Sequence, residues 1–103
     1  MDAPGYTSNQ DIIRTLSQRL REYRLAARLS QRELAERSGV GLATISHFEQ
    51  GTMLNLTLSN LISLLRVVGM EQRVEELLPR LPMHPDTLRQ INKLTPKRVR
   101  RGK

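Results

Sequence analysis

One segment, residues 31–50, constrains the fold of this chain more than any other, because it predicts two short helices joined by a tight turn. Ser30 and Glu33 have the spacing of a capping box, in which each side chain bonds the other residue's backbone amide at a helix start. A helix is therefore predicted over 31–38. Gly39 follows it, and a residue without a β-carbon is favoured where the chain turns in a left-handed conformation.

The second helix of this segment is predicted over 42–50 and is expected to cross the first at a steep angle. Ala35 is small enough to let the second helix pass over it, and Ile45 is expected to fill the space between the two helices. Further apolar residues complete the buried underside, namely Leu34, Val40 and Phe48. The opposite side is expected to face outward and carries mostly small and polar residues, namely Gly41, Leu42, Ala43, Ser46, His47 and Gln50.

The sequence on either side of this segment also predicts helices. From 9 to 27, apolar residues recur at three- and four-residue steps, which is the stripe of an amphipathic helix. A helix over 58–68 is predicted with Thr57 as its N-cap, and a short one over 71–78 ends before Pro79, which prevents its continuation. Because no strand-like alternation is present, the predicted fold class is all-α, with five helices.

Charge and composition divide the chain unevenly. Over 1–78, nine arginines balance nine acidic residues, whereas 79–103 carry eight basic residues against Asp86 alone and so hold the whole net charge of +7. The charge therefore belongs to an appendage and is not by itself evidence that the body binds nucleic acid. We expect residues 1–8 to be a disordered arm, 9–78 to be the helical domain, and the remainder to be a flexible, basic, proline-containing tail.

Size and composition exclude several classes of protein. The 103 residues allow one domain with a tail, and the lack of cysteine excludes a disulfide framework or a thiolate metal site. The chain has no run of roughly 18 apolar residues for a membrane span, and its N-terminal residues are too polar for the apolar region of a secretory signal, so a cytoplasmic protein with no membrane partner is expected. His47 and His84 have no second partner at a recognised spacing, so we expect no catalysis, no metal and no cofactor.

The crossing helices carry a recognisable pattern. The motifs Leu-Ser-Gln, Leu-Ala, Ser-Gly and Ala-Thr-Ile-Ser occur at fixed spacing in LSQRELAERSGVGLATISHFEQG, which resembles the helix-turn-helix of the XRE family of phage-repressor and Cro-like regulators. The resemblance extends over residues 12–78 and implies a phage-repressor-like DNA-binding domain. The alternative is a helical hairpin without a ligand, but such a hairpin does not need small residues at both crossing positions.

The family resemblance implies a role for particular residues. Base-reading positions are occupied by Leu42, Ala43, Ser46 and His47. Phosphate-contacting positions are occupied by Gln31, Thr44, Gln50 and Thr52. Common members carry Gln, Arg or Ser where Gly41, Leu42 and His47 stand here. Because apolar contacts to thymine methyls then replace part of the hydrogen bonding, we expect specificity either to be modest per half-site or to depend on DNA shape. The resemblance also implies a structural ion pair between Arg24 and Glu49.

A domain of this kind offers few base contacts, so a homodimer on a palindromic operator of double-stranded DNA is expected, with half-sites about one helical turn apart. The candidate dimer interface is the apolar set on the fifth predicted helix and its approach, namely Val67, Met70, Val74, Leu77 and Leu78. The alternative is that these side chains only close the core of the monomer.

The C-terminal segment ELLPRLPMHPDTLRQINKLTPKRVRRGK resembles the extension of XRE proteins of the HipB type, the antitoxins of HipA-like kinase toxins. This resemblance implies an autorepressor that also binds a HipA-like kinase toxin, although the dimer-forming strand of HipB is not visible in this sequence. Two alternatives remain open: a stand-alone phage- or plasmid-type repressor, and a protein-interaction adaptor that does not bind DNA.

Overall fold

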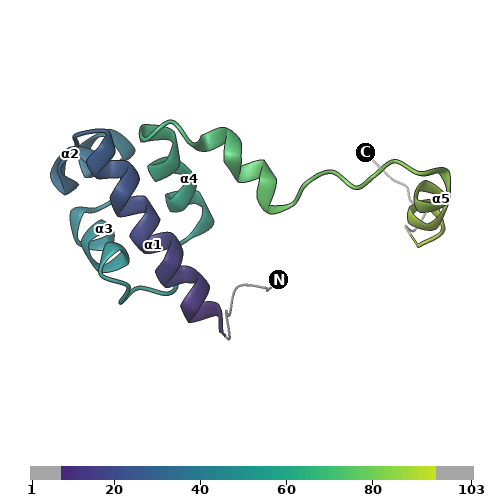
Figure 1. Ribbon diagram of the computed structural model, residues 1–103, viewed down its shortest axis with the longest axis horizontal. Helices are drawn as coiled ribbons and strands as arrows, with labels where there is room; N and C mark the ends of the chain where they lie inside the picture. The colour runs from purple at the N-terminus through teal and green to yellow at the C-terminus, as the bar shows by residue number, and fades with distance from the viewer. Residues whose placement is uncertain (1–7, 95–103) are drawn as a thin grey trace, which may run out of the picture.

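The computed structural model describes residues 8–94, and each regular element in that range is a helix (Figure 1). The elements are, in chain order, α1 (Asn9–Ala26), α2 (Gln31–Ser38), α3 (Leu42–Glu49), α4 (Leu58–Val67), the 3-10 helix η1 (Glu71–Leu77) and α5 (Pro85–Leu94). The predicted all-α fold class is confirmed. The bounds predicted for the first four helices differ from the observed ones by at most one residue.

Local capping defines the two short helices at the centre of the fold. The Ser30 hydroxyl accepts a hydrogen bond from the Glu33 amide at 3.0 Å, and the Glu33 carboxylate accepts one from the Ser30 amide at 2.8 Å, so the predicted capping box is present. Gly39 ends α2 at φ +78, in the left-handed region that its missing β-carbon allows. Its amide donates to the Ala35 carbonyl at 2.9 Å and closes the last turn of α2.

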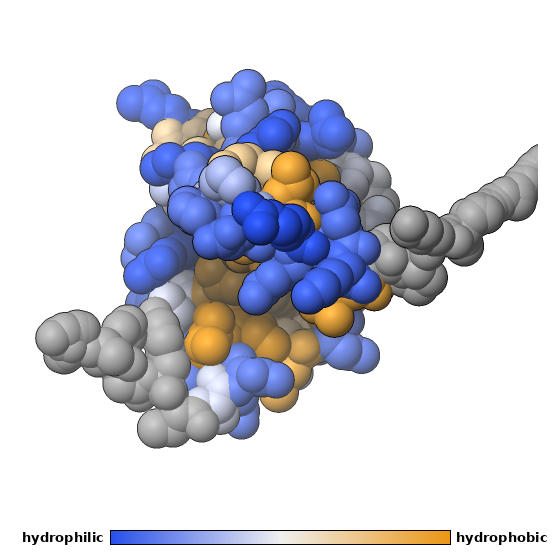
Figure 2. Space-filling model, turned by 90° about the vertical axis from the view of Figure 1, so that its right-hand side faces the viewer, coloured by the Kyte–Doolittle hydropathy of each residue, from blue (hydrophilic) through white to orange (hydrophobic). Residues whose placement is uncertain are grey.

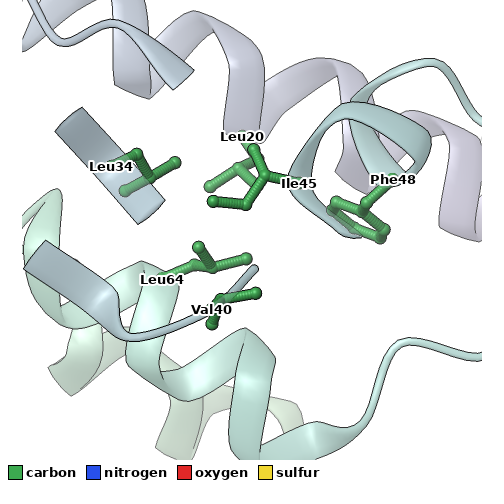
Figure 3. Close-up of a cluster of buried hydrophobic side chains, with 6 residues drawn as sticks. All are labelled: Leu20, Leu34, Val40, Ile45, Phe48 and Leu64. Atoms are coloured by element: carbon green, nitrogen blue, oxygen red, sulfur yellow. The ribbon is translucent and has the colours of Figure 1, made fainter. Parts of the chain in front are cut away.

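The core lies where α1, α2, α3 and α4 meet (Figure 3). Leu34, Ile45 and Leu64 are fully buried, one each from α2, α3 and α4. Leu20, Val40 and Phe48 surround them and are nearly as inaccessible. Burying an aliphatic or aromatic side chain of this size contributes about 1.5–3 kcal/mol, so this cluster is the main source of stability for the body.

The last helix of the body differs in type from the α-helix predicted over 71–78. Glu71–Leu77 form a 3-10 helix, in which the Leu78 amide bonds the Glu75 carbonyl three residues back at 3.2 Å. No residue of η1 is fully buried, and its sequence EQRVEEL has few apolar side chains to press a regular α-helix onto α4. 3-10 helices are frequent as connectors, and η1 links the helical body to the segment that leads to α5.

The sequence predicts no helix in the tail, whereas the structure has one there. Residues 85–94 form α5, which Pro85 begins at the one helical position that tolerates its missing N–H. The His84 ring accepts a hydrogen bond from the Asp86 amide at 3.1 Å and caps this start. Figure 1 shows α5 away from the body, at the end of an extended connection. The predicted arm, apart from Ser8, and the end of the tail after residue 94 lie outside the described residues.

Candidate nucleic-acid interface

The outer side of α3 is exposed, whereas its inner side is anchored in the core. Ile45 and Phe48 are 0% and 3% exposed, and they hold the helix from beneath. The four predicted base-reading residues lie on the other side, where Leu42, Ala43 and His47 are exposed and Ser46 is half-buried. The α3 helix therefore presents these side chains to solvent while its position is set by the core.

The polar side chains near the C-terminal end of α3 are already organised by local hydrogen bonds. The Gln50 side-chain amide donates to the Ser46 hydroxyl at 3.3 Å. Both the hydroxyl and the backbone amide of Thr52 donate to the His47 carbonyl, each at 3.0 Å. Gln50 and Thr52 are exposed and Thr44 is half-buried, so these three predicted phosphate residues lie on or next to the outer side of α3.

An ion pair joins α1 to the end of α3. The Arg24 guanidinium donates to both carboxylate oxygens of Glu49, from Nε and Nη2, each at 2.8 Å. Its Nη1 donates to the Leu29 carbonyl at 2.8 Å and so also holds the connection between α1 and α2. The two charged side chains are 8% and 2% exposed, and the hydrogen bonds to Glu49 raise the pKa of Arg24 above its ordinary value. Arg24 and Glu49 thus form the structural ion pair that the family resemblance implies.

The fourth predicted phosphate residue, Gln31, is tied to the same carboxylate. Its side-chain amide donates to Glu49 Oε1 at 3.0 Å, so the start of α2 is fastened to the end of α3. The first-turn backbone amides of Gln31 and Arg32 have no acceptor within the helix, as is general for helix starts. Such amides favour an anion. The fold therefore brings the start of α2 next to the end of α3 through Glu49.

The comparison with known families agrees with this geometry. A helix-turn-helix family model matches residues 20–71, which include α2, α3 and α4. The chain belongs to the XRE family of helix-turn-helix proteins. XRE proteins are DNA-binding transcriptional regulators, and this chain is one of them. No curated protein and no solved structure matches the chain.

The candidate dimer residues of this XRE protein lie in different surroundings. Val67 packs against the core cluster, and Met70 and Val74 are half-buried, whereas Leu77 and Leu78 are 63% and 89% exposed. An apolar groove of about 280 Å³ runs between α1, α4 and η1, and Met70, Val74 and Leu77 line it. Figure 2 views the molecule from the side of α5 and shows hydrophobic residues at the surface among hydrophilic ones.

Three polar residues of α1 lie beside α3, and the sequence pattern did not predict this. Arg14, Gln18 and Arg21 line a hollow of about 350 Å³ together with Glu49, Gln50 and Gly51. Their spacing of four and three residues places them on one face of α1 and is the signal that could have grouped them. Their closeness to α3 depends on how the helices cross, which no local pattern contains.

Within residues 8–94, no cluster of three or more His, Asp or Glu side chains is arranged to hold a metal ion. In the same range, none of the helices has the length and apolar character needed to cross a membrane.

Proposed function

We propose that this XRE protein is a repressor that binds a palindromic operator, with the outer side of α3 in the major groove. Leu42 and Ala43 offer apolar contacts to thymine methyls, and Ser46 and His47 offer hydrogen bonds to base edges. Support comes from one observation above all: these four side chains lie on the accessible side of a helix whose other side is locked in the core by Ile45 and Phe48.

The phosphate contacts proposed for Gln31, Thr44, Gln50 and Thr52 flank this reading surface. Because the Gln31 side-chain amide is bonded to Glu49, its contribution is the backbone amide at the start of α2 and the remaining hydrogen of the side chain. Gln50 and Thr52 are exposed just beyond Glu49, the residue to which Gln31 is bonded, so these three residues address the DNA backbone from neighbouring positions.

A homodimer is proposed to join two half-sites, with Val67, Met70, Val74, Leu77 and Leu78 as the contact surface. The exposure of Leu77 and Leu78 supports this use of η1, because neither side chain is needed in the core of one chain. Val67 already packs against the core cluster, so its share in the interface is the smaller one.

We also propose that the protein is an antitoxin and operon autorepressor that binds a HipA-like kinase toxin in the cytoplasm. The resemblance of the C-terminal extension to HipB-type proteins supports this. Helix α5 adds a second line of support, since it exposes apolar side chains on one face, namely Leu88, Ile91 and Leu94. The alternative functions are a stand-alone repressor, which needs no such partner face, and an adaptor, which needs no exposed reading surface on α3.

The test of the repressor function is selection of bound duplexes from random DNA. We expect a palindromic sequence with half-sites about one helical turn apart. His47→Ala should lose discrimination at one or two base pairs of each half-site, by about 1–3 kcal/mol each. Gln31→Ala should weaken binding to all sequences alike, because a phosphate contact carries no base preference. An unchanged preference in His47→Ala would contradict the assignment of the reading surface.

The antitoxin function is tested by a search for a HipA-like kinase gene next to this one and by co-expression with its product. We expect the two proteins to purify together and the pair to separate when Leu88 and Ile91 are both replaced by Asp. Arg89→Gln, on the same helix, is the control and should leave the complex intact. Absence of any such kinase would favour the stand-alone repressor.

A further inference from the structure

The hollow between α1 and the end of α3 carries positive charge that the fold does not use. Neither Arg14 nor Arg21 has an ion-pair partner among the described residues. The nearest acid in the hollow is Glu49, whose two carboxylate oxygens are occupied by Arg24 and whose Oε1 also accepts from Gln31. The negative charge of Glu49 is therefore balanced by Arg24, and the guanidinium groups of Arg14 and Arg21 have no counter-charge in the hollow.

This hollow adjoins the surface that is proposed to face DNA. Its wall includes Gln50, which is bonded to the reading residue Ser46, and Gly51, which begins the loop after α3. A β-carbon at position 51 would lie only 3.3 Å from Cγ of Arg14. The backbone of Gly51 also has a left-handed φ of +79, which glycine adopts without strain. The missing side chain lets Arg14 lie across the end of α3 rather than be pushed away from it.

We propose that Arg14, Gln18 and Arg21 form a DNA-backbone site that binds phosphate groups of the strand passing the C-terminal end of α3. This inference rests on the proposed function, since it needs α3 to lie in the major groove. Guanidinium groups bind phosphate with two parallel hydrogen bonds, and the amide of Gln18 adds a donor between them.

The spacing along α1 suits several phosphates. Arg14 and Arg21 are seven residues apart, which is about 10 Å along a helix. Phosphates recur every 3.4 Å or so of axis along one DNA strand, so the two guanidinium groups address different phosphates. The logarithm of the binding constant falls linearly with the logarithm of the salt concentration, and each neutralised phosphate steepens this slope by about 0.9.

The test is the salt dependence of binding to the selected operator duplex, followed by fluorescence anisotropy over a potassium chloride series. For the double variant Arg14→Gln, Arg21→Gln we expect the slope to be shallower by about 1.8, with the base preference unchanged. The matched control is Arg28→Gln with Arg66→Gln, which removes the same charge from exposed positions outside the hollow and should leave the slope near that of the wild type. The double variant Arg14→Lys, Arg21→Lys should retain most of the wild-type slope, because the charge is kept.

Two results would overturn the site. One is an unchanged slope in the glutamine double variant, and the other is an equal change in the control, which would reveal a general effect of net charge. A wild-type protein without preference for any DNA sequence would instead contradict the repressor function, and the phosphate site with it.

Discussion

Replacing Glu49 by glutamine is expected to damage this protein far more than its single lost charge suggests. Glu49 accepts three hydrogen bonds, two from Arg24 and one from Gln31, and its side chain is only 2% exposed. In Glu49→Gln the Arg24 guanidinium stays in place at 8% exposure, without a counter-charge and with too little water to replace it. Breaking one partner of such a buried pair costs about 3–5 kcal/mol.

That loss is a large part of the free energy of unfolding, because small domains are stable by only about 5–15 kcal/mol. Urea unfolding followed by circular dichroism measures it. The control is Glu76→Gln, which breaks an exposed pair with Arg73 whose side chains are 63% and 65% exposed, and should cost at most about 1 kcal/mol. The paired replacement of Arg24 by Met and Glu49 by Leu should recover much of the stability, because no unpaired charge is left. A Glu49→Gln protein within about 1 kcal/mol of the wild type would refute this reasoning.

Further predictions concern the core and the start of α2. Leu34→Ala, at a fully buried site, should destabilise the fold by about 2–5 kcal/mol, whereas Leu58→Ala, at 60% exposure, should change it by about 0.5 kcal/mol or less; urea unfolding of both variants compares them. Ser30→Ala should cost about 1 kcal/mol through loss of the cap, and a stability equal to the wild type would contradict the capping role. The pKa of Glu33 is lowered, mainly by the hydrogen bond from the Ser30 backbone and secondly by that from the Ser30 side chain. The contribution of the ionised Glu33 to folding stability is therefore fully present above the ordinary pKa of 4.5 and is lost as the pH falls through the lowered value. The free energy of unfolding should therefore decrease less between pH 6 and pH 3 in Glu33→Gln than in the wild type.

The elements at the centre of the fold were predictable because their signals are local. Ser30 and Glu33 are three residues apart, and the glycine at position 39 follows directly on α2, so a few neighbouring residues determine where that helix begins and ends. The anchoring of α3 by Ile45 and Phe48 likewise follows from helical periodicity alone.

The features that escaped prediction depend on long-range packing or on a weak local signal. Gln31 and Glu49 are 18 residues apart, and nothing local says that the side chain of Gln31 is bonded rather than free. The same holds for the closeness of Arg14 to Gly51, which arises from the crossing of α1 and α3. In α5 the helical signal is weak, because it consists of only three apolar residues at three-residue steps among prolines and charged residues. These apolar residues are Leu88, Ile91 and Leu94.

The placement of α3 in the major groove is tested most directly by methylation interference on the selected operator. Dimethyl sulfate methylates guanine N7, which lies in the major groove, and adenine N3, which lies in the minor groove. We predict that guanine methylation blocks binding in two clusters about one helical turn apart, while adenine methylation within these clusters has little effect. Interference confined to adenine N3, with no effect of methylation at the guanines of the half-sites, would contradict a major-groove role for α3.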